Sequence, residues 1–286
     1  MKAWNGKRVL ITGAAAGIGR ALAERLGARG AALILTDRDE APLAATADGI
    51  RRAGANAQHH VLDVTKGPSI LQARDAIHSR GGPIDVLVNN AGVVFGGAFV
   101  DVPLQKHLDT FSVNVLGLVS VTHAFLADLV GRPEAHLVNV ASAAGLTAVP
   151  FATTYASSKW AVVGFSESIR LELARQGHRH VHVTTVCPLY VSTGLFEGAR
   201  PPLLTSMLTP AQLADEIVEG VERDRVFVRT PWLVKLVPFL NGVLPTGLAD
   251  ALSSALGAAG SMEQWTGRAA KVPEAPARRV AGRRRR

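Results

Sequence analysis

Thr12-Gly13-Ala14-Ala15-Ala16-Gly17-Ile18-Gly19 is the stretch of sequence that decides the fold. It follows the short apolar run Arg8–Thr12, which indicates a buried strand, and leads into Gly17–Arg29, an amphipathic stretch of helix length. Glycines at such a turn let the backbone bend tightly and approach a pyrophosphate, which rests on the positive end of the helix. The spacing is G-x-x-x-G-x-G, not the G-x-G-x-x-G of other dinucleotide folds. The stretch therefore predicts a phosphate-binding loop between a strand and a helix.

Beyond this loop, short apolar runs alternate with helix-length amphipathic stretches. Most of the runs are continuous in Val, Ile and Leu, as in strands that are buried on both faces of a parallel sheet. The expected strands are Arg8–Thr12, Ala32–Asp37, Gln58–Asp63, Ile84–Asn89, His136–Ser142, Val181–Cys187 and Arg225–Arg229. The expected helices are Gly17–Arg29, Glu40–Ala53, Lys66–Ser79, Leu104–Val130, Thr154–Arg175 and Pro210–Glu222. This pattern predicts an α/β, Rossmann-type fold: a doubly wound, seven-stranded parallel sheet with helices on both faces.

The domain organisation follows from length and composition. At 286 residues, 48% of them hydrophobic, the chain can form one large α/β domain, which we place at residues 1–268. Glycines and prolines in residues 189–209 predict a mobile lid loop over the carboxyl edge of the sheet. Residues 230–268 form an apolar C-terminal extension. Residues 269–286 are rich in Pro, Ala and Arg, and we expect a basic, disordered tail.

The apolar extension does not have the length of uninterrupted apolar sequence that a membrane span needs. Lys235, Asn241 and Asp250 interrupt it, whereas a span requires about 20 apolar residues. A substrate-pocket wall or an oligomer contact is the preferred interpretation, and a peripheral membrane contact is the alternative.

Charge and cysteine content exclude several classes of protein. Of the surplus of eight positive charges, six come from arginines in Ala277–Arg286, so the rest of the chain carries a surplus of only two. The positive charge is therefore concentrated in a tail and does not indicate a nucleic-acid-binding face. The single cysteine, Cys187, excludes an internal disulfide and a cysteine-based metal site, and we predict no metal. The first residues carry no apolar signal run, so we expect a cytoplasmic protein.

Asp37 and Arg38, at the end of the second predicted strand, bear on the choice of nucleotide. A carboxylate there can accept hydrogen bonds from the ribose hydroxyls of NAD and repel the 2′-phosphate of NADP. Arg38 could instead pair with that phosphate. We favour NAD, because a carboxylate that faces a phosphate is costly. NADP remains the alternative.

Tyr155 and Lys159 lie four residues apart on a predicted helix, so their side chains share a face. A neighbouring cation and a positive nicotinamide ring would bring the pKa of a phenol from about 10 toward the working range. Ser142 ends the fifth predicted strand, where its hydroxyl could hold a substrate oxygen. Asn114 lies among apolar neighbours, and a water linked to Lys159 is one way to satisfy its amide.

Together these residues resemble the short-chain dehydrogenase/reductase family over about residues 7–229. The resemblance implies that Asn114, Ser142, Tyr155 and Lys159 form a catalytic tetrad, with Tyr155 as general acid/base and Ser142 orienting the substrate. It also implies cofactor contacts beyond Asp37 and Arg38, and these are Gly13, Gly17, Ile18, Gly19, Asp63, Val64, Asn90, Tyr155, Lys159, Val191 and Thr193. The family usually has Pro-Gly where this chain has Pro188-Leu189, which bears on the Val191 and Thr193 contacts because leucine does not adopt positive φ cheaply.

The sequence thus predicts an NAD(P)-dependent oxidoreductase that interconverts an apolar alcohol with its ketone or aldehyde. The resemblance also implies a homodimer or homotetramer. An NADPH-dependent carbonyl reductase of the same fold, a cofactor-binding regulator without turnover, and a membrane-surface protein are the alternatives.

Overall fold

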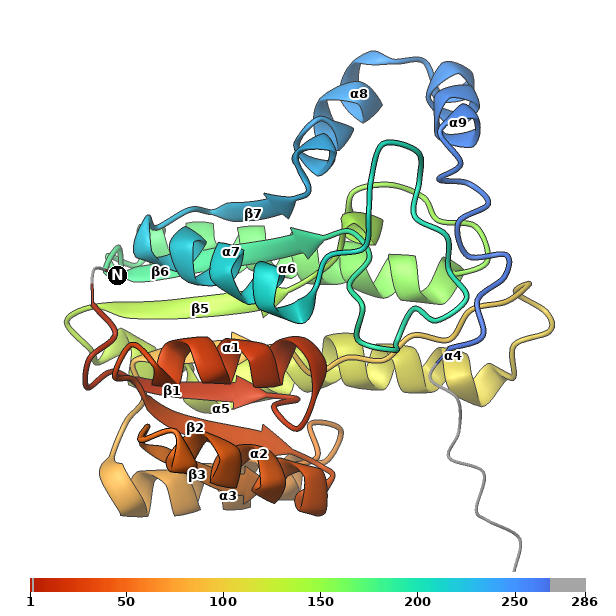
Figure 1. Ribbon diagram of the computed structural model, residues 1–286. Coiled ribbons are helices and arrows are strands. Elements are labelled where there is room, and N and C mark those ends of the chain that lie inside the picture. Colours follow the sequence, from red (N-terminus) through yellow and green to blue (C-terminus); the bar gives the residue numbers. More distant parts are fainter. Residues whose placement is uncertain (2, 268–286) are drawn as a thin grey trace, which may run out of the picture.

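The computed structural model describes residue 1 and residues 3–267, and it confirms the seven-stranded parallel sheet (Figure 1). The strands are β1 Arg8–Thr12, β2 Ala32–Asp37, β3 Ala57–Val61, β4 Val86–Asn89, β5 Ala135–Val140, β6 Val181–Pro188 and β7 Phe227–Thr230. Their order is β3-β2-β1-β4-β5-β6-β7, and every pairing is parallel. The order reverses between β1 and β4, and ligands of such folds bind outside the carboxyl ends of the strands at this point.

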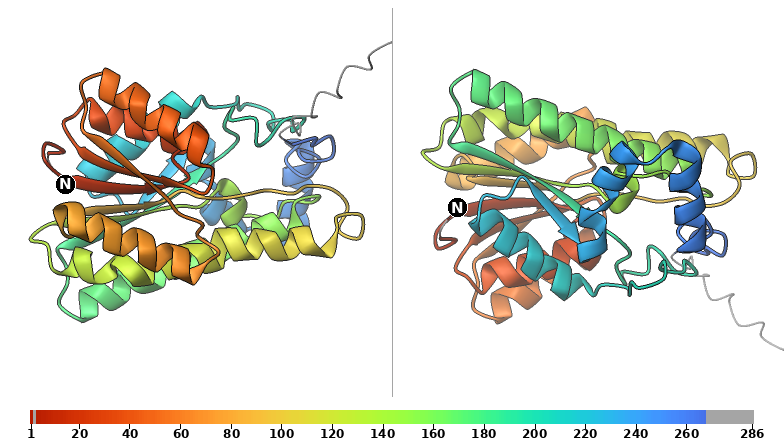
Figure 2. Two further views of the ribbon diagram at one scale, coloured as in Figure 1. Left: turned by 90° about the horizontal axis from the view of Figure 1, so that it is seen from below. Right: turned by 90° about the horizontal axis from the view of Figure 1, so that it is seen from above.

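Two layers of helices cover opposite faces of the sheet (Figure 2). One face carries α1 Gly17–Gly27, α2 Glu40–Arg52 and α7 Pro210–Glu222. The other carries α3 Gly67–Gly81, α4 Leu104–Phe111, α5 Leu118–Val130 and α6 Thr153–Arg175. Each layer buries its own apolar cluster against the sheet. Leu22 and Leu213 represent the first cluster, and Phe125 and Ile77 the second. Burial of such side chains, each contributing about 1.5–3 kcal/mol, is the main stabilising term.

The helix predicted at Leu104–Val130 is interrupted by a π-helical turn, η1 Ser112–Gly117, between α4 and α5. Such turns insert an extra residue into the helix and are frequent at functional sites. Within the described residues, Leu104–Val130 is also the one helix whose length and apolar composition would suffice to cross a membrane. Val121, Phe125 and Leu129 are buried against the sheet, so in this structure the helix belongs to the layered domain.

The apolar extension folds into short helices, which the sequence had not predicted. These are η3 Trp232–Lys235, α8 Val237–Val243 and α9 Thr246–Ala255. They stand beyond the edge strand β7 (Figure 1). The chain then returns across the lid as residues 258–267, which we call the C-terminal strap. The predicted tail, residues 269–286, lies outside the described residues.

The strap is tied to the lid by several hydrogen bonds. The Trp265 indole N–H donates to the Leu195 carbonyl at 3.0 Å, and the Thr266 N–H donates to the Glu197 carbonyl at 2.9 Å. The Arg200 N–H donates to the Ser261 carbonyl at 2.9 Å. The lid and the strap therefore form one layer over the carboxyl edge of the sheet.

Candidate active site

The glycine loop forms a turn that no other residue could make. Gly13 and Gly17 have φ of +67° and +57°, the left-handed region that favours glycine. A Cβ on Gly19 would lie 2.3 Å from the Gly13 carbonyl oxygen, because α1 begins directly against the loop. The Asn90 side-chain amide donates to the carbonyls of Thr12 and Gly13, at 2.9 and 3.1 Å, and so fixes the loop from β4.

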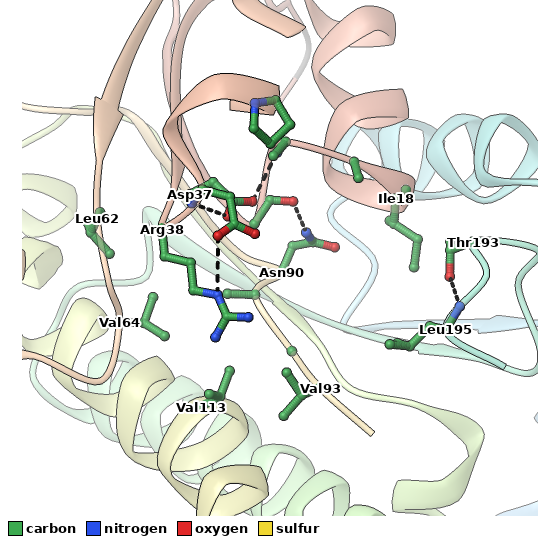
Figure 3. Close-up of a pocket in the computed structure, with 18 of the residues that line it drawn as sticks. Ile18, Asp37, Arg38, Leu62, Val64, Asn90, Val93, Val113, Thr193 and Leu195 are labelled. Carbon is green, nitrogen blue, oxygen red and sulfur yellow. Dashed lines mark hydrogen bonds and ion pairs between the residues drawn. The ribbon is translucent and has the colours of Figure 1, made fainter. Parts of the chain in front are cut away.

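A cavity of about 340 Å³ opens in front of this loop (Figure 3). Its wall runs from the ends of β2 and β3, past the glycine loop, to the segment that follows β4 and to the lid. The residues that line it include Gly13, Gly17, Ile18, Asp37, Arg38, Asp63, Val64, Asn90, Gly92, Val93, Val113, Thr193 and Leu195. The backbone N–H groups of a helix start and an acid at the end of β2, both in this wall, fit a dinucleotide. We call it the cofactor cavity.

Asp37 is held in place at one end of this cavity. One carboxylate oxygen accepts from the Ala15 N–H at 3.1 Å, and the other from the Asp39 N–H at 3.2 Å. Arg38 lies beside it, and its guanidinium extends into the cavity (Figure 3), 3.7 Å from Asp39. The Arg38 side chain is 65% exposed. The acid is therefore anchored by the backbone, whereas the arginine is a solvated side chain with one loose ion pair.

Asp63 and Val64 form the adjoining wall. Burial tends to raise the pKa of Asp63, but hydrogen bonds from the Thr65 hydroxyl and N–H, together with Lys66, outweigh it and lower the pKa. The carboxylate is thus engaged by the turn that leads into α3. Val64 packs against Gly117 of η1, where a Cβ would lie 2.7 Å from the Val64 methyl.

Ser142 and Tyr155 come together where β5 ends. Ser142 caps the short helix η2 Ala143–Gly145, and its hydroxyl accepts from the Ala144 N–H at 3.1 Å. A Cβ on Gly145 would lie 2.6 Å from the Lys159 carbonyl, so only glycine lets η2 pack this closely on α6. This packing places the Ser142 hydroxyl beside the Tyr155 phenol in the wall of one cavity.

Burial controls the protonation of this pair and of Lys159. It raises the pKa of Tyr155, and the neighbouring Ser142 hydroxyl partly opposes the rise. Burial also lowers the pKa of Lys159 to about 8. The Lys159 ammonium lies 5.7 Å from the centre of the Tyr155 ring and donates to the Val140 carbonyl at 2.9 Å. Without a cofactor, the phenol is therefore neutral and the lysine still largely protonated near pH 7.

Asn114 lies in the π-helical turn and is satisfied by protein groups. Its amide oxygen accepts from the Val93 N–H at 2.8 Å, and its nitrogen donates to the Val93 carbonyl at 2.9 Å and to the Ser158 hydroxyl at 3.0 Å. The sequence had offered a water linked to Lys159 as one partner for this amide. In the structure, Val93 and Ser158 use both of its donor hydrogens.

A second, smaller cavity of about 60 Å³ opens beside Ser142 and Tyr155, and we call it the substrate cavity. Its lining comes from the β5–α6 connection, the lid and the strap, and no charged side chain from residues 1 and 3–267 contributes to it. The residues are Ser142, Ala143, Ala144, Thr147, Ala148, Val149, Ala152, Tyr155, Leu189, Tyr190, Phe196, Pro202, Ala258, Ser261 and Met262. Lys159 links the two cavities, because a Cβ on Gly92 of the cofactor cavity would lie 3.7 Å from the Lys159 nitrogen.

The departure at Pro188-Leu189 is accommodated without strain. Leu189 is not among the residues with positive φ, and its N–H donates to the Thr230 carbonyl at 2.9 Å. Thr193 lines the cofactor cavity, as expected. Val191 lies apart from the residues that line the two cavities: its side chain is buried in the core and its backbone pairs with Leu208 at the base of the lid, so its cofactor contact stays a prediction.

Several residues of the site were missed by sequence reasoning. Val93, Val113 and Leu195 line the cofactor cavity, and Tyr190, Phe196, Ser261 and Met262 line the substrate cavity. Tyr190 and Phe196 lie on the predicted lid, so their aromatic side chains could have been identified from the sequence as candidates for the cavity wall. Ser261 carried none, because its partner Tyr190 is 71 residues away in the chain.

Comparison with known proteins places this geometry among nicotinamide-dependent enzymes. A family model described as short chain dehydrogenase matches residues 7–203. Human epidermal retinol dehydrogenase 2 is 34% identical over 251 residues, which are 86% of this chain and 81% of that protein. Mouse estradiol 17-beta-dehydrogenase 11 is 34% identical over 250 residues, which are 86% of this chain and 83% of that protein.

Solved structures agree with these sequence relatives. A short-chain dehydrogenase/reductase from Burkholderia phymatum in complex with NAD superimposes with a TM-score of 0.77 at 30% identity, covering 85% of this chain and 95% of that one. An alcohol dehydrogenase from Thermococcus sibiricus complexed with 5-hydroxy-NADP has a TM-score of 0.69 at 28% identity, covering 78% of this chain and 94% of that one.

Proposed function

This chain belongs to the short-chain dehydrogenase family, and from that premise we propose that it interconverts an apolar alcohol and its ketone or aldehyde with NAD as cofactor. The observation that carries the proposal is the junction of the two cavities. Ser142 and Tyr155 lie side by side in the wall of an apolar cavity, and Lys159 lies between them and a cavity that fits a dinucleotide. The retinol and estradiol in the names of two relatives, both lipophilic alcohols, support the same substrate class.

Four residues carry the proposed chemistry. Ser142 would hold the substrate oxygen, and Tyr155 would exchange a proton with it. Lys159 would contact the nicotinamide ribose and stabilise the phenolate of Tyr155. Asn114 would position the segment after β4 and α6 through Val93 and Ser158, since its side chain bonds to both.

The proton and the hydride follow separate routes. When bound, the nicotinamide ring supplies a hydride acceptor or donor at C4 and, in its oxidised form, a positive charge. In oxidation Tyr155 would act as the phenolate, stabilised by the Lys159 ammonium and by the positive charge of the bound ring, and would accept the alcohol O–H proton. In reduction Tyr155 returns the proton to the carbonyl oxygen. The raised pKa of the buried phenol keeps it protonated, as the reduction requires.

NAD is the cofactor that the anchoring of Asp37 favours. Two backbone N–H groups fix the carboxylate in the cavity, where it would accept from ribose hydroxyls and repel a 2′-phosphate. The second candidate, an NADPH-dependent carbonyl reductase, rests on the Arg38 guanidinium, which extends into the same cavity.

A substrate screen tests the proposal. Purified protein with NAD⁺ is offered retinol, a hydroxysteroid, 2-octanol and, as a polar control, sorbitol, and NADH formation is followed. We expect turnover of at least one lipophilic alcohol and none of sorbitol. Turnover of sorbitol alone would contradict the apolar substrate class. Turnover that requires NADP⁺ would favour the second candidate.

We also propose a peripheral lipid contact through the apolar extension. Trp232, Leu236, Phe239 and Val243 recur at helical spacing and are all exposed, at 62%, 42%, 69% and 59%. The basic tail favours an anionic surface. Co-sedimentation with anionic and neutral vesicles tests this contact. Phe239→Asp should reduce anionic-vesicle binding, Leu171→Asp on α6 is the control, and equal binding by the two variants would contradict the contact.

The oligomeric state remains a proposal as well. Leu104, Leu108, Phe111 and Leu116 leave an exposed apolar strip on α4 and η1. Such a strip supports the homodimer or homotetramer implied by the family. Sedimentation equilibrium would show a mass of two or four chains, and a monomer at every concentration would contradict the proposal. The cytoplasmic location stays a prediction.

A further inference from the structure

Tyr190 carries the most informative polar contact outside the proposed catalytic residues. Its backbone forms the base of the lid, where its carbonyl accepts from the Leu208 N–H at 2.9 Å. Its ring meets Phe196 edge-on, with centroids 5.2 Å apart, and Phe196 in turn meets Tyr155 edge-on at 5.8 Å. Phe196 therefore contacts both phenol rings, that of Tyr155 at the reacting end of the substrate cavity and that of Tyr190 on the side of the strap.

The Tyr190 hydroxyl joins the lid to the strap. It donates to the Ser261 hydroxyl at 2.7 Å, and the Ser261 hydroxyl donates to the Ala258 carbonyl at 2.7 Å. Tyr190 is 7% exposed and Ser261 3%, and both line the substrate cavity. Burial raises the pKa of Tyr190, so its phenol keeps the proton that makes this bond.

Each hydroxyl has one hydrogen, and both hydrogens are used within the protein. Only oxygen lone pairs remain for a ligand at this end of the cavity. Among the residues that the structure describes, the cavity wall contains no charged side chain, and the side chain of Arg200 on the lid is exposed. A ligand carboxylate placed there would face oxygen atoms without a donor or a cation, which is costly in an apolar site.

We infer that Tyr190 and Ser261 are specificity-determining residues that admit an alcohol whose far end is hydrocarbon or hydroxyl and exclude one that ends in a carboxylate. This inference rests on the proposed function, since it assumes that the reacting carbinol lies at Ser142 and Tyr155. It goes further in stating which lipophilic alcohols the cavity accepts. Hydroxy fatty acids would be rejected, whereas diols and simple apolar alcohols would be accepted.

A matched set of ligands tests this selectivity by binding, without turnover. For each chain length from six to ten carbons, the set contains the 2-alkanol, the diol with a second hydroxyl at the far end, and the hydroxy acid with a carboxylate there. Dissociation constants are measured on the NADH-saturated wild-type protein from the nicotinamide fluorescence. At the best-fitting length, the hydroxy acid should bind on the order of 100-fold more weakly than the alkanol, and the diol at least as tightly.

Two variants locate the effect. Ser261→Ala frees the Tyr190 hydrogen to point into the cavity, so the penalty on the hydroxy acid should shrink by about tenfold, roughly one hydrogen bond to a charged group. Tyr190→Phe removes the acceptor, so the diol should lose its advantage over the alkanol. Ser192→Ala is the control, because Ser192 lies on the same lid with an exposed hydroxyl bonded to Leu208 and does not line the cavity.

The outcomes separate this inference from the proposed function. Equal binding of alkanol and hydroxy acid, no binding of any alkanol, or the same ratio in Ser261→Ala as in the wild type would overturn the inference. Retained NADH affinity and an unchanged melting temperature show that a variant is folded. Parallel turnover assays with NAD⁺ test the proposed function alone: the expected binding order without turnover would overturn that function and support the selectivity.

Discussion

The cofactor cavity and the substrate cavity lie next to each other at one edge of the sheet, yet they are built by different means. The cofactor cavity depends on backbone shape: Gly13, Gly17 and Gly19 form a cradle, and N–H groups hold Asp37. The substrate cavity is shaped by side chains from the lid and the strap, such as Phe196 and Met262. A backbone site tolerates almost no added atom. A side-chain site can change its selectivity by substitution without loss of the fold.

The largest effect on cofactor binding should come from adding one methyl group to the backbone cradle. Gly19→Ala would place a Cβ 2.3 Å from the Gly13 carbonyl, so the loop must move, and we expect NADH affinity to fall on the order of 100-fold. Gly49→Ala in α2 is the matched control, because open space surrounds that position. Fluorescence titration measures both variants. Wild-type affinity in Gly19→Ala would show that the cradle does not bind the cofactor.

Removing the anchored acid should change which nucleotide binds. Asp37→Ala takes away the acceptor for ribose hydroxyls and the repulsion of a 2′-phosphate while leaving Arg38 in place. We expect the NADH-to-NADPH affinity ratio to fall by about tenfold or more. Asp215→Ala on α7, an exposed acid paired with Arg25, is the control. An unchanged ratio in Asp37→Ala would mean that the acid is not the selector.

A substitution in the wall of the substrate cavity should affect substrate binding and leave cofactor binding unchanged. Phe196→Ala removes the ring between Tyr155 and Tyr190, so KM for an apolar alcohol should rise by about tenfold while NADH affinity stays within about twofold. Phe239→Ala on the exposed face of α8 is the control for losing a phenyl ring. An equal loss of NADH affinity in Phe196→Ala would contradict the division between the two cavities.

The smallest expected effect is a pH dependence of stability at Lys159, where the cavities meet. Burial lowers its pKa from the ordinary value of 10.5 to about 8, so the folded protein releases this proton at a lower pH than the unfolded chain does. The cost of burying the charge is therefore present below pH 8 and is relieved as pH rises toward 10.5. Relative to Lys159→Met, wild-type stability in urea should rise between pH 8 and pH 10. A flat or falling difference would contradict the lowered pKa.

The sequence predicted the cofactor side better than the substrate side, for a physical reason. Gly13 to Gly19 and Asp37 act within one strand-helix-strand unit, so their spacing along the chain reports their geometry. The four proposed catalytic positions could be named from motifs. The hydrogen bonds of the Asn114 side chain to Val93 and Ser158 could not, because they depend on how the segment after β4 and helix α6 pack around it. The contact between Tyr190 and Ser261 joins the lid to the strap, 71 residues further along the chain, and no sequence motif includes both residues.

We propose that Tyr155 transfers the proton while the separate cradle binds the cofactor, and Tyr155→Phe tests this division most directly. This variant keeps the ring that packs on Phe196 and removes only the hydroxyl. We predict turnover of a lipophilic alcohol below about one thousandth of the wild-type rate, with NADH affinity within about twofold of the wild type. Turnover close to the wild-type rate in Tyr155→Phe would contradict the account.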